Sequence, residues 1–206
     1  DALPICPHKA SLCIFDFSGA GLSDGDYISM GIYEKDDTIT MMDHIRNNYG
    51  VQHFVIWGRS MGAATALQAY PMMRGVFAMV LDSPFTTVSS VYRNAAKQHV
   101  SLPGLVIDLV FAYATSQIKQ RYGFDVSAIR PYQNGPLINV PTVLIGAKED
   151  QITDYSDLIE LYNTIPLDEN RKVIVECEGK HNDDRDPRTL SNILEVWNGP
   201  NSASKL

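Results

Sequence analysis

The pattern that most constrains the fold is an alternation between two kinds of apolar segment. Short, almost continuously apolar runs alternate with longer segments in which apolar residues recur every three to four positions. The short runs are typical of strands buried on both faces of a parallel sheet, and the spaced segments are typical of amphipathic helices. The expected strands are Leu12–Phe15, Phe54–Trp57, Val76–Leu81, Thr142–Ile145 and Arg171–Cys177. We therefore predict an α/β fold with a doubly wound, mainly parallel sheet.

The expected helices carry boundary signals of their own. The apolar positions within Ile39–Tyr49 have helical spacing, and Gly50 follows as a stop. Tyr155–Ile165 repeats the pattern. The stripe within Leu190–Trp197 follows Asp186, an N-cap candidate that precedes a first-turn proline. These segments supply the helices that an α/β sheet needs between its strands.

One long segment departs from the alternation. Residues 85–140 separate two expected strands by far more chain than one crossover helix requires, with helical stretches around 88–99 and 105–120. We predict a single domain over 1–206, with a core of about 11–84 and 141–198 and a helical cap insertion at about 85–140. An apolar stripe in the insertion should be buried, either on the sheet edge or as a roof over a cleft that holds an acyl chain. Its members are Leu102, Leu105, Val106, Leu109, Val110 and Tyr113.

Composition excludes several classes of protein. The 206 residues are 45% hydrophobic and 20% charged, which argues against disorder. A net charge of -7 with scattered Lys and Arg argues against a nucleic-acid partner. No apolar run approaches the roughly 18 residues of a membrane span. Cys6, Cys13 and Cys177 fit neither a disulfide framework nor a zinc site, so we expect a cytoplasmic protein.

A serine lies at the sharp turn expected after the second strand. The sequence Gly58-Arg59-Ser60-Met61-Gly62 follows Phe54–Trp57 and precedes a run of small residues that favours a helix. This is the G-x-S-x-G pattern of a nucleophile elbow in its strand, turn and helix context. Glycines are expected beside the serine because Cβ atoms would collide with the neighbouring strand and helix. We predict that Ser60 is a nucleophile, the alternative being a plain turn serine.

A serine hydroxyl reacts only when a base takes its proton and a carboxylate orients that base. The candidate base is His181, which follows Arg171–Cys177 at the carboxyl edge where the sites of open α/β sheets gather. The competing histidines are His8, His44, His53 and His99. The loop after the preceding strand offers both Glu149 and Asp150. We prefer Asp150, because the apolar Ile152 can anchor the loop beneath it.

The order serine, aspartate, histidine is that of α/β hydrolases, and further segments resemble this superfamily. Asp16–Gly25 resembles its D-x-x-G-x-G-x-S-x-G turn, Asp82–Phe85 the segment after its sixth strand, and Gly179–Asn182 its G-x-H-N loop. The resemblance covers roughly residues 11 to 198 and is specific in combination. The chain is similar to serine-aminopeptidase-like and depalmitoylase-like hydrolases.

One element of the family pattern is missing from the sequence. The resemblance implies an earlier strand ending in His-Gly, whose loop donates a backbone N–H to the oxyanion hole beside the Met61 N–H. The residues before Leu12 contain no His-Gly, so we expect the domain to be N-terminally incomplete. Losing one oxyanion donor typically costs about 10²–10³ in rate, which leaves inactivity of this chain alone as an open alternative.

The function expected from these residues is that of a serine hydrolase. It would cleave a carboxylic ester or thioester through an acyl-enzyme, with Ser60, Asp150 and His181 as the triad. The alternatives are an aminopeptidase-like amide hydrolase and a non-catalytic binding protein of the same fold. No metal or organic cofactor is implied. The expected partner is a small ester or thioester, acyl or lipid-like in one version, and nothing in the sequence indicates contact with a membrane surface.

Overall fold

The computed structural model describes residues 11–186 and residue 189. A four-stranded sheet has the order β1-β2-β3-β4, and each strand is parallel to its neighbours. The strands are β1 (Phe54–Arg59), β2 (Val76–Asp82), β3 (Thr142–Ala147) and β4 (Lys172–Cys177). The predicted α/β class with a mainly parallel sheet is confirmed.

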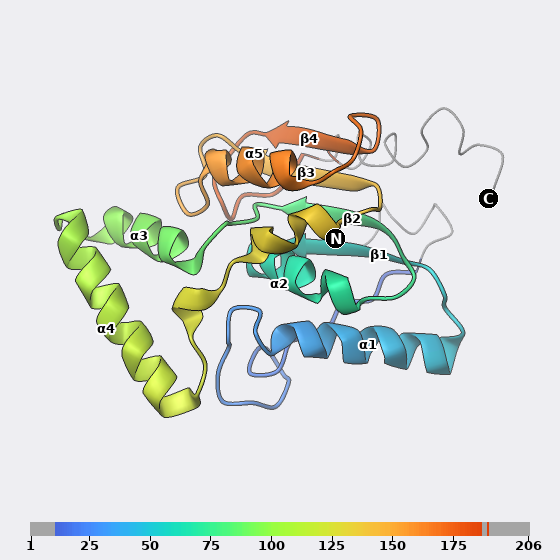
Figure 1. Ribbon diagram of the computed structural model, residues 1–206, viewed down its shortest axis with the longest axis horizontal. Helices are drawn as coiled ribbons and strands as arrows, with labels where there is room; N and C mark the ends of the chain where they lie inside the picture. The colour runs from blue at the N-terminus through green and yellow to red at the C-terminus, as the bar shows by residue number, and fades with distance from the viewer. Residues whose placement is uncertain (1–10, 187–188, 190–206) are drawn as a thin grey trace.

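Helices lie between the strands in the order that the sequence predicts (Figure 1). The α-helices are α1 (Glu34–Tyr49), α2 (Met61–Ala69), α3 (Val88–His99), α4 (Gly104–Tyr122) and α5 (Tyr155–Thr164). Short 3₁₀ segments are η2 (Tyr70–Met72), η3 (Val126–Ala128) and η4 (Pro131–Leu137). Helix α1 ends where expected, because Gly50 adopts the left-handed conformation with φ 71°.

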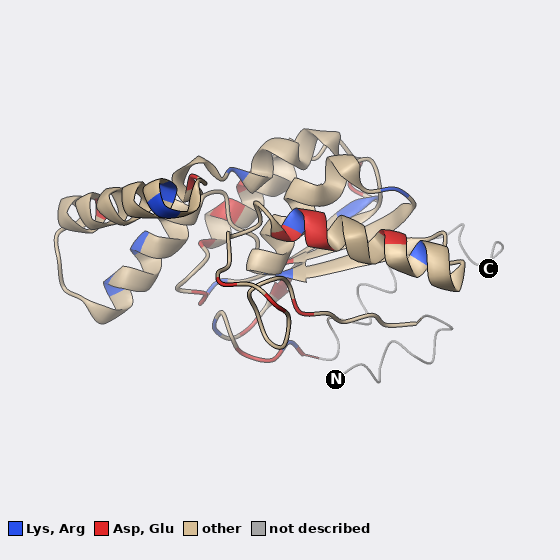
Figure 2. Cartoon of the chain, turned by 90° about the horizontal axis from the view of Figure 1, so that it is seen from below, with Lys and Arg blue, Asp and Glu red and all other residues tan. Residues whose placement is uncertain are grey.

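The charged residues of α1 are arranged to suit the helix dipole. Helix α1 has Glu34, Asp36 and Asp37 in its first turn and Arg46 in its last, the favourable polarity for the macrodipole. In Figure 2 basic and acidic segments are interspersed over the described chain.

The main core lies between one face of the sheet and helices α2 and α5. Met79, Leu81 and Leu144 point from the strands into this cluster, and all three are fully buried. Val80 and Val143 alternate with them and belong to a second buried cluster on the opposite face. Strands with buried side chains on both faces explain the continuous apolar runs in the sequence.

The expected strand at Leu12–Phe15 is wrong for the described structure. These residues have no strand assignment, and Ile14 is 80% exposed. A strand needs a neighbour for its backbone groups, and β1 is the last strand on its side of the described sheet. The helix expected within Leu190–Trp197 lies outside the described residues.

The segment 85–140 divides into a projecting part and a part that joins the core. Figure 1 shows α3 and α4 beyond the carboxyl ends of the strands, with α4 extending away from the sheet. Ile138, near the end of the segment, is fully buried in the main core with α2 and α5. The projecting helices therefore stand at the edge of the sheet where a parallel fold gathers its functional loops.

The predicted burial of the apolar stripe in the insertion, most of which lies in α4, is wrong within the described chain. All six of its members are exposed, with Leu105 at 72% and Leu109 at 63%. Helix α4 packs through another face. Ile107 on that face is buried, and Phe111 and Ile118 are partly buried against a cluster that includes Val88 and Phe124. Both faces have helical apolar spacing, so periodicity alone could not choose between them.

A pair of substitutions in α4 tests which face carries its packing. Ile107→Ala should lower the free energy of unfolding by about 2–5 kcal/mol, because it removes a buried side chain and leaves a cavity. Leu109→Ala should change it by no more than about 0.5 kcal/mol. Urea denaturation of the full-length protein measures both. Equal losses in the two variants would show that the exposed face is also packed.

Candidate active site

Ser60 occupies a sharp turn between β1 and α2. Its backbone has φ 52° and ψ -114°, a conformation that a non-glycine residue rarely adopts. Two backbone hydrogen bonds fix the turn, since Ser60 N donates to Asp82 O at 2.8 Å and Ala64 N donates to Ser60 O at 3.0 Å. The hydroxyl is thereby presented at the carboxyl edge of the sheet, at the N-terminus of α2.

The two glycines beside this turn differ in what they do. A Cβ at Gly58 would lie 2.3 Å from the carbonyl oxygen of Gly62, so only glycine fits there. A Cβ at Gly62 would meet no described atom within 4 Å outside the local helix backbone. The expected steric need for glycine therefore holds at the first position and not at the second.

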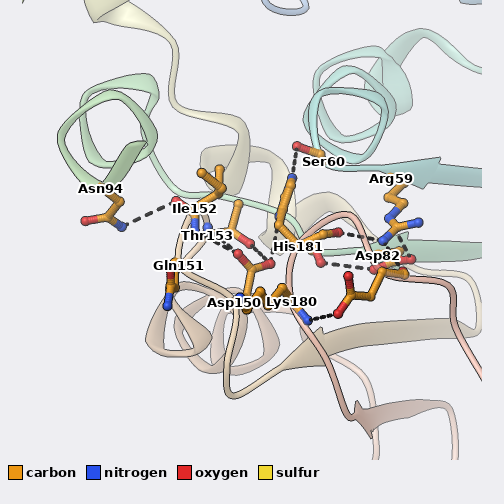
Figure 3. A network of polar contacts seen from close by, with 12 residues as sticks. Arg59, Ser60, Asp82, Asn94, Asp150, Gln151, Ile152, Thr153, Lys180 and His181 are labelled. Carbon is orange, nitrogen blue, oxygen red and sulfur yellow. Dashed lines mark hydrogen bonds and ion pairs between the residues drawn. The ribbon is translucent and has the colours of Figure 1, made fainter. Parts of the chain in front are cut away.

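The structure brings the three predicted site residues together (Figure 3). His181 Nε2 lies 3.0 Å from Ser60 Oγ, and His181 Nδ1 lies 2.7 Å from Asp150 Oδ2. In a neutral imidazole whose Nδ1 donates to the carboxylate, Nε2 is the nitrogen that can accept the serine proton. The histidine side chain is 12% exposed and the aspartate side chain 2% exposed.

The loop after β3 holds Asp150 in its ionised form. Oδ1 accepts the backbone N–H groups of Ile152 and Thr153 at 2.8 and 3.0 Å, and Oδ2 accepts the Thr153 hydroxyl at 2.8 Å. Burial acts to raise the pKa of Asp150, but the hydrogen bonds from His181 and from this loop outweigh it and lower the pKa to about 2. The carboxylate can therefore orient the imidazole and balance a positive charge on it.

The other candidates for the acid and the base are exposed or lie outside the described residues. Glu149 is exposed, while Asp150 beside it faces His181. His44, His53 and His99 are exposed, and His8 lies outside the described residues. Of the two acids that the sequence offered, the structure therefore places Asp150, and not Glu149, against His181.

Met61 lies directly after Ser60, at the start of α2. As the first residue of α2, it has a backbone N–H outside the hydrogen-bond pattern of the helix. Such N–H groups at a helix N-terminus favour negative charge.

Sequence reasoning missed several polar residues around Ser60, Asp150 and His181. Thr153 completes the hydrogen bonding of Asp150 through both its N–H and its hydroxyl. Arg59, Asp82 and Arg185 form a second polar group behind His181. The available signal was Asp82 itself, a carboxylate at the end of an otherwise apolar strand, whereas nothing in the sequence pairs it with either arginine.

Two further properties concern ligands and membranes. Within residues 11–186 and 189, no three or more His, Cys, Asp or Glu side chains are grouped so that they could hold a metal ion. No helix in that part of the chain combines the length and apolar character needed to cross a membrane.

The fold and this arrangement of residues define an α/β hydrolase, and comparison with known proteins agrees. Residues 6–116 match the family described as serine aminopeptidase, S33, and the chain belongs to this family. A curated relative, the uncharacterized protein YfhR of Salmonella typhimurium, is 24% identical over 191 residues. That alignment covers 85% of this chain and 56% of the relative, so the chain spans about half the length of the curated relatives it matches.

Solved structures share the fold. The esterase Pf2001 of Pyrococcus furiosus superposes with a TM-score of 0.63 at 21% identity, covering 88% of this chain and 65% of the esterase. A monoacylglycerol lipase of Paleococcus ferrophilus gives a TM-score of 0.56 at 17% identity, covering 89% of this chain and 80% of the lipase. These likenesses confirm the predicted fold, and the family match confirms the predicted superfamily and supports a hydrolase.

The low pKa of Asp150 makes a prediction about stability. A free aspartate in an unfolded chain has a pKa of about 3.9, above the folded value. Ionised Asp150 therefore stabilises the fold above about pH 4, and this contribution is lost as the pH falls towards 2. Asp150→Asn should be less stable than the parent near pH 6, and the gap should narrow as the pH falls towards about 3.

Urea denaturation at a series of pH values measures this gap. Glu149→Gln is the matched control, since it removes an exposed carboxylate from the adjacent position and should show little gap at any pH. A gap for Asp150→Asn that is constant over the whole range would contradict the account.

Proposed function

We propose that this chain carries the catalytic triad of a serine hydrolase that cleaves a carboxylic ester or thioester. The observation that carries the proposal is the pair of contacts made by one imidazole, 3.0 Å from Ser60 Oγ and 2.7 Å from Asp150 Oδ2. Membership of a hydrolase family supports it. So does the Ser60 turn, which exposes the hydroxyl at a helix N-terminus.

The first half of the reaction forms an acyl-enzyme. Ser60 Oγ attacks the carbonyl carbon of the substrate while its proton passes to His181 Nε2, and Asp150 stabilises the resulting imidazolium. The carbonyl oxygen becomes an oxyanion that accepts a hydrogen bond from the Met61 N–H. Collapse of the tetrahedral intermediate expels the alcohol or thiol, which takes the proton from Nε2.

The second half repeats the chemistry with water. A water molecule gives a proton to His181 Nε2 and attacks the acyl carbon, and the bond to Ser60 then breaks. The proton returns to Ser60 Oγ and a carboxylic acid leaves. The triad therefore ends in its starting protonation state, with no cofactor consumed.

The buried carboxylates near Ser60 already have partners, which favours an ester over a substrate with a free amine. An aminopeptidase needs an acidic group to hold the substrate amine. The two buried carboxylates beside Ser60 already have cationic or imidazole partners, since Asp82 pairs with Arg185 and Asp150 with His181. An amine held by either of these two carboxylates would have to displace its partner, which supports the ester or thioester proposal.

Replacing members of the triad tests the proposal. Asp150→Asn should lower kcat for a p-nitrophenyl ester by about 10²–10⁴-fold, because the imidazole loses the partner that fixes its tautomer and orientation. Ser60→Ala should abolish covalent catalysis. Glu149→Gln is the matched control and should stay within about twofold, because its side chain is exposed. Steady-state kinetics of the full-length protein measure all three.

Two outcomes would contradict this assignment. Hydrolysis by Ser60→Ala at the parental rate would place the nucleophile elsewhere, and a full-length parent with no turnover of esters, thioesters or amino-acid anilides would favour a non-catalytic binding protein. Preference for the anilides would favour the aminopeptidase alternative.

The acyl part of the substrate is proposed to be apolar. Helix α4, which stands beyond the carboxyl ends of the strands in Figure 1, carries Leu105, Leu109 and Tyr113 on its exposed face. Helix α3 ties this cap to the site, because Asn94 Nδ2 donates to Ile152 O at 3.3 Å and to Asp154 Oδ2 at 3.0 Å. An exposed apolar surface on the side of the sheet where its strands end suits an acyl chain.

An ester series of increasing acyl length tests this extension. The parent should prefer medium or long chains over acetyl, and Leu109→Ser should weaken that preference by about 3- to 10-fold, as expected for loss of apolar contact. Tyr49→Ser, a change at an exposed apolar residue at the far end of α1, is the control. An unchanged chain-length profile in Leu109→Ser would show that this face does not contact the substrate.

A further inference from the structure

A buried carboxylate that the proposed reaction does not use lies behind the triad. Asp82, at the end of β2, is 1% exposed. Arg185 Nε lies 3.2 Å from each of its two oxygens, and Arg185 Nη2 lies 2.9 Å from Oδ1. On the other side, Arg59 Nε lies 3.5 Å from Oδ2. One buried anion thus faces two guanidinium groups.

The second of these arginines also reaches the histidine loop. Arg59 Nη2 donates to the backbone carbonyl of His181 at 2.5 Å and to that of Asp183 at 2.8 Å. Arg59 is the residue directly before Ser60 in the chain. A single side chain therefore connects the turn that carries the nucleophile with the backbone of the residue that carries the base (Figure 3).

Arg185 closes the loop from its other end. Its Nη1 donates to the carbonyl of Lys180 at 3.3 Å, and its Nη2 donates to Ser83 Oγ at 2.9 Å. The carbonyls on and next to His181 are thus held by two cations that share Asp82. Burial acts to lower the pKa of Arg185, but Asp82 outweighs it and raises the pKa, so the guanidinium keeps its charge.

Energetics favour a well-defined geometry for this network. Two cations and one anion leave the network with a net positive charge. The carbonyl oxygens of the loop accept hydrogen bonds from its guanidinium groups. Removing one member of a buried ion pair leaves the other uncompensated, which is strongly unfavourable. A guanidinium fixes the direction of its hydrogen bonds as well as their length, because its N–H groups lie in one plane in a fixed arrangement.

We propose that the network of Arg59, Asp82 and Arg185 is a positioning device that sets the distance between His181 and Ser60. This inference rests on the proposed hydrolase function. None of the three residues is assigned to the reacting atoms. They act through the backbone of the histidine loop, so that the imidazole meets Ser60 Oγ and Asp150 at once.

A charge-conserving substitution tests the geometry. Arg59→Lys keeps the positive charge but loses the planar group that faces Asp82 through one nitrogen and two carbonyls through another. It should lower kcat by about 10- to 100-fold, as expected for a misplacement of roughly 1 Å, with KM nearly unchanged. Arg46→Lys is the matched control, because Arg46 also joins a carboxylate, Asp43, to a backbone carbonyl. Its kcat should be parental.

A spectroscopic readout separates this inference from the function on which it rests. The proton between His181 Nδ1 and Asp150 gives a strongly downfield ¹H signal while that hydrogen bond persists. In Arg59→Lys the signal should broaden or disappear, with the far-ultraviolet circular dichroism unchanged. This measurement needs no turnover, so a parent without hydrolase activity would overturn the proposed function and leave the positioning to be judged by the signal.

Arg185→Lys repeats the test from the other end of the loop and should lower kcat in the same way. Parental kcat and a parental downfield signal in both variants would overturn the inference. Failure of both to fold would also overturn it, because the network would then be supporting the domain as a whole. A lowered kcat with an intact signal in both would show that the contact between His181 and Asp150 does not depend on the two guanidinium groups, which contradicts a positioning role.

Discussion

The geometry of the site depends on a strained residue directly after β1. Ser60 has φ 52°, and a conformation of this kind costs about 1–3 kcal/mol unless the surroundings impose it. The surroundings here are the β2 carbonyl of Asp82, which accepts the Ser60 N–H, and helix α2, which begins at the next residue. The same Asp82 offers its side chain to two arginines. Strand β2 therefore fixes the Ser60 turn with its backbone, and it takes part in holding the histidine loop through the Asp82 carboxylate.

Much of this architecture could be predicted because it follows from local patterns. Strands buried on both faces must be apolar at every position, and their parallel arrangement places the loops after Thr142–Ala147 and Lys172–Cys177 beside Ser60. The chain order of three residue types then nominates His181 and the loop that holds Glu149 and Asp150, and Ile152 favours Asp150 within that loop. Asp150 is held in place by hydrogen bonds from the backbone N–H groups of Ile152 and Thr153. The spacing of residues in the sequence indicates these hydrogen bonds only weakly.

What could not be predicted depends on contacts between distant segments. The run Leu12–Phe15 has strand composition, yet the described structure gives it no strand partner. In α4, Leu109 and Ile107 are both apolar at helical spacing, and only tertiary packing decides that Ile107 is buried. Arg59 is the variable position of a G-x-S-x-G motif, and its link to a carbonyl 122 residues away has no signature in the sequence.

The central claim is that Ser60 is activated by His181, and mapping a covalent adduct tests it most directly. The full-length protein would be treated with a fluorophosphonate, digested and analysed by peptide mass spectrometry. The account predicts one phosphonyl group on Ser60, with labelling greatly slowed in a His181→Ala variant because the base that takes the serine proton is gone. An adduct on another residue, or labelling of Ser60 at the same rate without His181, would contradict it.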